Sequence, residues 1–106
     1  MTPERREEVF IRDMYTCQKC GKTPGQDGLQ IAHRMHQGKQ TENYIIGVIN
    51  AEYGVSVSRK WVKDHVIDHP LNVATSCPDC NSYFNLLFKR VEAKKLLDTI
   101  LADVID

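Results

Sequence analysis

The chain of 106 residues contains four cysteines in two pairs with the same spacing, Cys17-Gln18-Lys19-Cys20 and Cys77-Pro78-Asp79-Cys80. A pair with this spacing can direct two thiolates from one tight turn at one ion, and two such turns complete the tetrahedral sulfur shell of a structural Zn²⁺. Two disulfides would need an oxidising compartment, and a thioredoxin-like redox motif would account for only one pair. The spacing therefore favours a structural zinc site made of Cys17, Cys20, Cys77 and Cys80.

Further polar side chains that could do chemistry lie between and just after the two cysteine pairs. His33 ends a short alternating stretch, residues 29–33, that is typical of a strand. Asn72 lies in a second predicted strand, residues 71–75. Asn81 and Asn85 follow the second cysteine pair four residues apart, so a helix there would place both on one face.

Helices must position these residues, and the chain offers several with recognisable starts. Thr2 and Pro3 are a typical N-cap and first helical residue, and apolar spacing predicts a helix over residues 3–14. Between the strands, Thr41 is expected to begin a helix that Gly54 ends, and Ser56 or Ser58 a second helix that ends before Pro70. Pro78 is expected to open a long C-terminal helix over residues 78–104.

Composition sets limits on the class of protein. The formal net charge is +0, with 14 basic and 14 acidic side chains, which argues against a non-specific cationic binder, although a local basic patch would suffice for nucleic acid. Four thiolates on Zn²⁺ would make the metal site itself negative, so the remaining surface is less acidic than the count suggests. We expect no secretory signal, no membrane span and a cytoplasmic protein of one domain, residues 1–106.

Three stretches taken together resemble the HNH endonuclease family, in its zinc-bearing form. They are residues 12–21 (RDMYTCQKCG), 29–34 (LQIAHR) and 70–81 (PLNVATSCPDCN). His33, Asn72 and Asn81 supply, in order, the three named residues of the family's pattern. The resemblance covers roughly residues 5–90, and any one of its pieces alone would be weak.

The resemblance implies an α+β fold with a ββα-metal core. Two antiparallel strands and a helix, within about residues 12–35 and 69–90, would hold one catalytic divalent cation, and the four cysteines would hold a separate structural zinc. A helical insertion over about residues 37–68 would separate the two strands. Helices at both ends of the chain would flank this core.

The resemblance also implies an activity, which is metal-dependent hydrolysis of DNA phosphodiester bonds. His33 would be the general base, Asn72 would fix the hairpin that carries it, and Asn81 and Asn85 would hold the catalytic cation (Mg²⁺, Mn²⁺, Ni²⁺ or Zn²⁺). The chemistry is reasonable, because a neutral imidazole accepts a proton near neutral pH and a divalent cation stabilises the charge that develops on the phosphoryl group. A phage, mobile-element or restriction context would suit so compact an enzyme.

One residue departs from the family's pattern. Ala32 precedes His33, where the family usually has a metal-ligating Asp or His, and a methyl group cannot ligate a metal. His36, Asp68 or His69 could substitute as ligands. The departure favours an alternative function, a non-catalytic zinc module on the HNH scaffold that binds DNA or protein.

DNA is the expected partner in the first hypothesis. Arg34 and Lys39 are candidate phosphate contacts, and the insertion adds the basic residues Arg59, Lys60 and Lys63. The two predicted helices of the insertion faintly resemble a helix-turn-helix, although a packed helical pair is the simpler interpretation. The apolar face of the C-terminal helix could serve a homodimer or simply cover the core.

Overall fold

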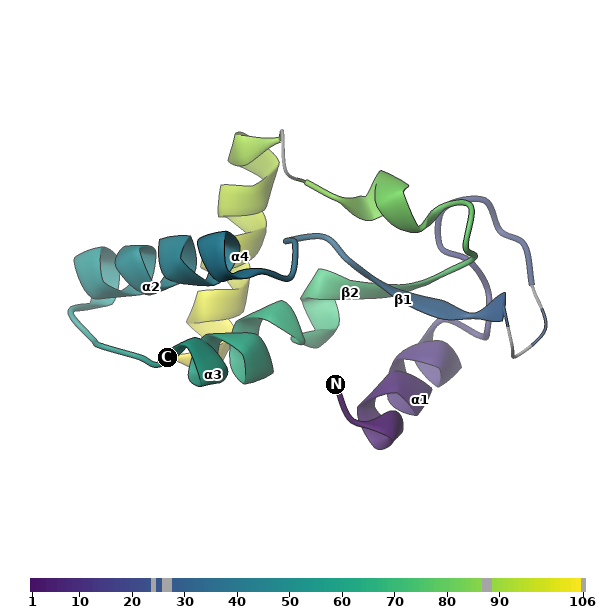
Figure 1. The fold of residues 1–106 in the computed structure, drawn as a ribbon, viewed down its shortest axis with the longest axis horizontal. Helices are drawn as coiled ribbons and strands as arrows, with labels where there is room; N and C mark the ends of the chain where they lie inside the picture. Colours follow the sequence, from purple (N-terminus) through teal and green to yellow (C-terminus); the bar gives the residue numbers. More distant parts are fainter. Residues whose placement is uncertain (24, 26–27, 87–88, 106) are drawn as a thin grey trace.

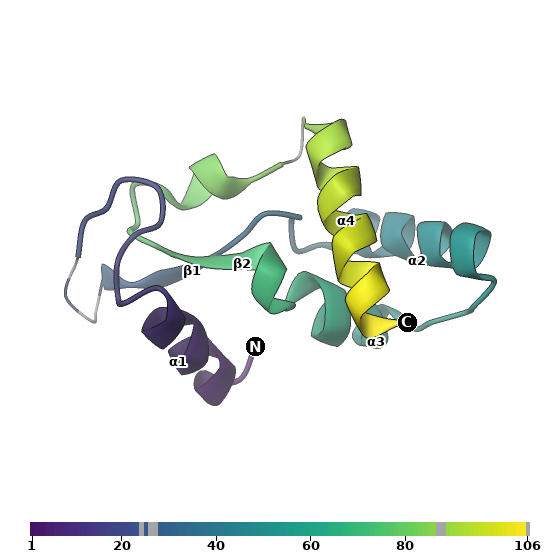
Figure 2. The same ribbon diagram turned by 180° about the vertical axis from the view of Figure 1, so that it is seen from behind.

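The structure is a computed structural model that describes residues 1–23, 25, 28–86 and 89–105. A two-stranded antiparallel sheet lies in the middle, with helix α1 beside it and helices α2, α3 and α4 gathered at the opposite end (Figure 1). The view from behind shows the same separation (Figure 2). This arrangement is α+β, as the sequence predicted.

Helix α1 (Pro3–Arg12) begins as expected. The Thr2 side chain accepts a hydrogen bond from the Arg5 backbone N–H at 3.2 Å, which satisfies one of the free amides at the helix start. The helix ends before residue 14 because Met14 and Tyr15 adopt left-handed backbone angles, with φ of 57° and 53°. This turn directs the chain into the first cysteine pair.

The two strands, β1 (Gln30–His33) and β2 (Val73–Ser76), pair with Gln30 opposite Ser76 and His33 opposite Val73. Strand β2 begins two residues later than predicted. The preceding residues form a one-turn 3-10 helix, η3 (Pro70–Asn72), in which His69 Nδ1 accepts a hydrogen bond from the Leu71 N–H at 3.1 Å. Asn72 therefore lies at the entrance to β2 and not within it.

The insertion between the strands is helical, as predicted. Helix α2 (Lys39–Tyr53) starts two residues before Thr41 and ends at Gly54, whose φ of 67° is left-handed and favours glycine. Ser58 caps helix α3 (Arg59–Val62) by accepting a hydrogen bond from the Trp61 N–H at 3.0 Å, and the chain continues as a π-helix, η2 (Lys63–Ile67).

A continuous apolar core joins this insertion to helix α4 (Arg90–Val104). Its buried members come from α2, α3, η2, α4 and the second residue after β1: Met35, Ile45, Ile49, Val62, Val66, Ile67, Leu97, Ile100 and Leu101. Helix α3 is one turn long and its Val62 is fully buried in this core. The insertion therefore packs its helices into the core, in agreement with the packed helical pair that was the simpler interpretation of the sequence.

The expected continuous helix over residues 78–104 is wrong. A short 3-10 helix, η4 (Asn81–Phe84), follows the second cysteine pair, and Asn85 then turns extended, with φ −68° and ψ 125°. The Leu86 N–H donates to the carbonyl of Arg34, the residue after β1, at 2.8 Å. This bond holds the chain after Asn85 in a non-helical conformation. Leu87 and Phe88, within the predicted helix, lie outside the described residues. No helix in the described part of the chain is long and apolar enough to cross a bilayer.

Candidate zinc site and the neighbouring hairpin

The four cysteine sulfurs come together at one end of the pair of strands β1 and β2, which we call the hairpin. The Sγ atoms of Cys17, Cys20, Cys77 and Cys80 all lie within 4.8 Å of one another. Cys20 Sγ and Cys77 Sγ are 3.8 Å apart, close to the roughly 3.8 Å that tetrahedral zinc with 2.3 Å Zn–S bonds requires. This cluster can hold a zinc ion, as the spacing predicted.

Backbone hydrogen bonds shape both cysteine turns. The Gly21 N–H donates to the Cys17 carbonyl at 2.9 Å, and the Cys80 N–H donates to the Cys77 carbonyl at 3.1 Å. Gly21 has a φ of 79°, a left-handed angle that glycine adopts without a side-chain clash. Each turn thereby presents its two thiols on the same side.

The thiols differ in their acidity. Burial raises the pKa of Cys17, but hydrogen bonds from the backbone of Cys20 and Cys77 outweigh it and bring the pKa to about 6. Hydrogen bonding with Cys77, together with burial, raises the pKa of Cys80 to about 12. The Cys17 thiol therefore loses its proton most readily. A divalent cation would stabilise the other thiolates, because metal binding displaces their protons.

Hydrogen bonds connect the first cysteine turn and the residues before it to β2. The Gln18 N–H donates to the Thr75 carbonyl at 3.0 Å, and the Asp13 carboxylate accepts from the Thr75 N–H at 2.8 Å. Asp13 also accepts from Arg12 at 2.9 Å. These hydrogen bonds therefore join the end of α1, the first cysteine turn and β2.

His33 lies at the end of β1, on the face opposite Ala32 because side chains alternate along a strand. Its Nε2 lies 3.0 Å from Oδ1 of Asp68, whose carboxylate is 2% exposed. The structure thus places Asp68 as a partner of the histidine. The sequence indicates Asp68 only as a possible metal ligand, because nothing in the spacing links two residues on opposite sides of a helical insertion.

Asn72 directly precedes β2 and is fully buried. Its Oδ1 accepts from the Met35 N–H at 2.8 Å, and its Nδ2 donates to the carbonyls of Met35 and Ile67 at 3.2 and 2.7 Å. Its own carbonyl accepts from the Arg34 N–H at 2.8 Å. These four bonds fix the exit of β1 against the entrance of β2.

The position where the resemblance puts a catalytic cation is apolar. Ala32, Ala74 and Phe84 form a buried cluster between the hairpin and η4. Asn81 Nδ2 donates to Gln30 Oε1 at 2.8 Å, and Asn85 Nδ2 donates to His36 Nδ1 at 3.3 Å. The two asparagines do not share a helix face, because the helix ends at Asn85. These residues do not fit a second metal.

The candidate substitute ligands His36, Asp68 and His69 each bond to another side chain. His69 accepts from the Leu71 N–H through Nδ1 and bonds Asp103 at 2.8 Å through Nε2, so it ties η3 to α4. Asp68 is bonded to His33, and His36 is exposed. Among the residues that the structure describes, the four cysteines are the one group of three or more His, Cys, Asp or Glu side chains that could hold a metal.

The candidate DNA contacts lie at the exit of β1. Arg34 places its guanidinium 5.4 Å from the centre of the Phe84 ring, and Lys39 is the exposed first residue of α2. In the insertion, Arg59 lies 3.6 Å from Glu42 and Lys60 lies 2.8 Å from Asp64. The insertion's basic residues are thus partly neutralised.

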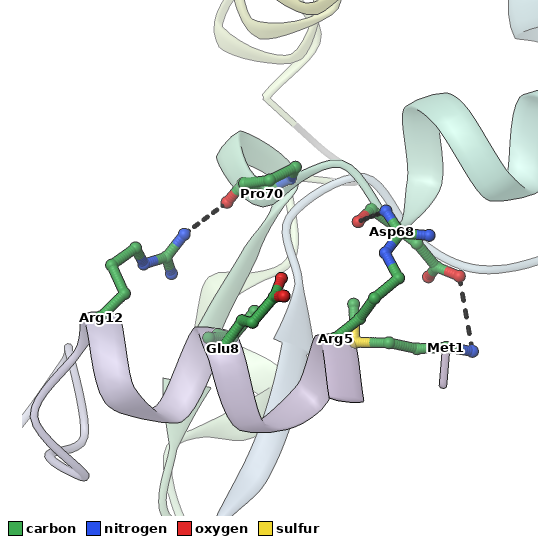
Figure 3. A pocket seen from close by; sticks show the side chains of 7 residues that line it. Met1, Arg5, Glu8, Arg12, Asp68 and Pro70 are labelled. Atoms are coloured by element: carbon green, nitrogen blue, oxygen red, sulfur yellow. Dashed lines mark hydrogen bonds and ion pairs between the residues drawn. The ribbon is translucent and has the colours of Figure 1, made fainter. Parts of the chain in front are cut away.

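A small depression beside α1 is a structural contact and not a ligand site. Its volume is about 160 Å³, and Arg5, Arg12 and Asp68 line it (Figure 3). Arg5 donates to the carbonyls of Asp64 and Asp68 at 3.2 and 2.9 Å. Arg12 donates to the Pro70 carbonyl at 2.7 Å. Arg5 therefore holds α1 against η2, and Arg12 holds it against η3 and the start of β2.

Comparison with known proteins finds no matching family model, no matching curated protein and no matching solved structure.

Proposed function

We propose that this protein is a zinc-stabilised module, built on a hairpin laid out like that of HNH proteins, which binds nucleic acid without cleaving it. The observation that carries the proposal is the buried cluster of Ala32, Ala74 and Phe84. It occupies the space between hairpin and η4 where a nuclease of this kind would hold its cation. Removing water from a divalent cation without supplying oxygen or nitrogen ligands is strongly unfavourable.

Nucleic acid is the partner that the distribution of cations favours. The bond between Leu86 and Arg34 brings the exit of β1 beside the segment that leads into α4. Four basic side chains lie along these two segments, and together we call them the basic rim: Arg34, Lys39, Lys89 and Arg90. A cluster of this kind contacts phosphates even when the net charge of the chain is zero.

The experiment measures binding and cleavage on the same preparation. Zinc-loaded protein is titrated into fluorescein-labelled DNA across a series of KCl concentrations, and the expected result is binding that weakens steeply with salt. Supercoiled plasmid is incubated in parallel with Mg²⁺, Mn²⁺, Ni²⁺ or Zn²⁺, and we expect no nicking. Absence of DNA binding at low salt would refute the proposal.

A second function, metal-dependent DNA cleavage, is favoured by one specific observation. The bond of His33 Nε2 to the Asp68 carboxylate leaves Nδ1 as the proton acceptor of a neutral ring, which is the arrangement of an oriented general base. Nicking of plasmid that disappears in His33→Ala, with zinc content unchanged, would establish this function and overturn the non-catalytic one.

A further inference from the structure

A groove lies between the first turns of α2 and α4. Its volume is about 480 Å³, within the roughly 300–1,000 Å³ of ligand-binding pockets. Helices α2 and α4 cross in the half of the molecule that lies away from α1 (Figures 1 and 2). The metal site and His33 do not line this groove, so neither the zinc nor the hairpin accounts for it.

The floor of the groove is apolar and one wall is aromatic. Met35, Ile45 and Leu97 form the floor from the edge of the core. Tyr44 lies on the wall and is 58% exposed, although a tyrosine ring of this size usually gains from burial. An exposed ring beside an apolar floor suits a flat, partly apolar ligand such as a nucleobase, and base–aromatic stacking is a general source of affinity.

The charged side chains that line the groove are basic. Arg90 and Lys94 line it, and none of the described lining residues is Asp or Glu. Lys94 bonds Glu52 at 2.8 Å and Asp98 at 2.6 Å, so these two carboxylates more than balance its single positive charge. Arg90 and the neighbouring Lys39 form no ion pair with the part of the chain that the structure describes. These two side chains are therefore available to an anionic ligand.

We propose that this groove binds a single-stranded segment of nucleic acid, with bases over Tyr44 and the apolar floor and phosphates at Arg90 and Lys39. The inference rests on the proposed nucleic-acid binding and specifies its substrate class. Duplex DNA is disfavoured because its bases are stacked inside the helix and cannot enter an apolar groove. A peptide would use the same floor, but it would not need the surrounding positive charge.

The test compares a labelled dT12 strand with a labelled 12-base-pair duplex by fluorescence anisotropy. Wild type should bind the single strand more tightly. Tyr44→Ala should weaken single-strand binding by about 5- to 150-fold, the usual effect of removing one stacking ring, whereas Tyr44→Phe should retain it. Tyr83→Ala removes another exposed tyrosine, on η4 and outside the groove, and should have no effect.

The charge is tested with a matched pair on α4. Arg90→Gln should flatten the slope of log K against log salt for dT12 by about 0.7, the value for one phosphate contact on a single strand. Lys95→Gln removes an exposed cation outside the groove and should leave the slope unchanged. Zinc content and the melting temperature verify that each variant is folded.

The outcomes separate this inference from the function on which it rests. Salt-dependent DNA binding that prefers the duplex, or that is unchanged in Tyr44→Ala and Arg90→Gln, would overturn the groove proposal and leave the proposed function standing. Absence of binding to either DNA would overturn both proposals.

Discussion

Asp68 shows how much a single buried carboxylate can organise. Its carboxylate lies 3.0 Å from His33 Nε2 and 3.5 Å from the Met1 amino group. Its backbone carbonyl accepts a hydrogen bond from the Arg5 guanidinium. A buried carboxylate in this position is stabilised only as long as its partners remain. The residue therefore connects α1, the end of β1 and the end of η2.

Replacing Asp68 by asparagine should test this role. We expect Asp68→Asn to lower the free energy of unfolding by about 1.5–3 kcal/mol, the usual contribution of a hydrogen bond to a charged group. Urea denaturation at pH 7 measures it. Asp98→Asn, which removes an exposed carboxylate on α4, is the control and should cause little change. Equal effects of the two substitutions would contradict the role given to Asp68.

At the scale of elements, the contact between α1 and β2 depends on Asp13. Burial raises the pKa of its carboxyl, but hydrogen bonds from Arg12 and from the Thr75 backbone outweigh burial and hold the pKa below its usual value. A lowered pKa means that the unfolded chain binds the proton more readily than the folded one. The stabilisation is therefore present above the unfolded pKa of about 3.9 and is lost as pH falls through the folded value.

This predicts a specific acid response. The urea midpoint of wild type should fall as the pH is lowered below about 4, and in Asp13→Asn it should fall less, because the group that titrates has been removed. Glu92→Gln removes an exposed acid from the first turn of α4 and should leave the wild-type response intact. If the urea midpoint fell equally with pH in wild type and in Asp13→Asn, the Asp13 carboxyl would not contribute to the acid response.

Local signals predicted some elements well. Thr2, Pro3 and Ser58 mark helix starts that the structure has, and Gly54 marks a helix end. The two strands were also predicted, with boundaries that differ by up to two residues. In each case the determinant is a cap, a glycine or an alternating pattern within a few residues of the boundary.

The break at Asn85 could not be predicted, because its cause is a contact distant in sequence. The apolar residues after Asn85 continue a helical spacing, but the Leu86 N–H is taken by the Arg34 carbonyl. The same limitation hid Asp68 as the partner of His33. The cysteine cluster was predictable because each of its turns is local, whereas the asparagine ligand pair depended on a helix that is not there.

In the whole molecule, two separate apolar clusters stabilise different parts of the chain. The larger one joins the insertion to α4, and the smaller one, Ala32, Ala74 and Phe84, lies next to the cysteines. A cluster of three residues contributes little stability by itself, so the hairpin half should depend on bound zinc. The helical half has its own core and should depend on it less.

Zinc removal should therefore affect the two halves unequally. Chelation of the zinc-loaded protein is expected to speed amide hydrogen exchange in β1 and β2 far more than in α2 and α4, measured by mass spectrometry. Cys20→Ser, which removes one ligand, should reproduce the effect and lower the zinc content below one ion per chain. A uniform loss of protection across all four elements would show that the molecule unfolds as one unit.

The long connection between the strands has a kinetic consequence. Residues 34–72 separate β1 from β2, so strand pairing must close a loop much larger than a hairpin turn, and loop-closure entropy opposes it. Helical contacts within the insertion are local and form faster than pairings between distant segments. The insertion should consequently act as a folding template: once α2, α3 and η2 are packed, they bring Arg34 and Asn72 together, and the sheet and the cysteine cluster assemble last.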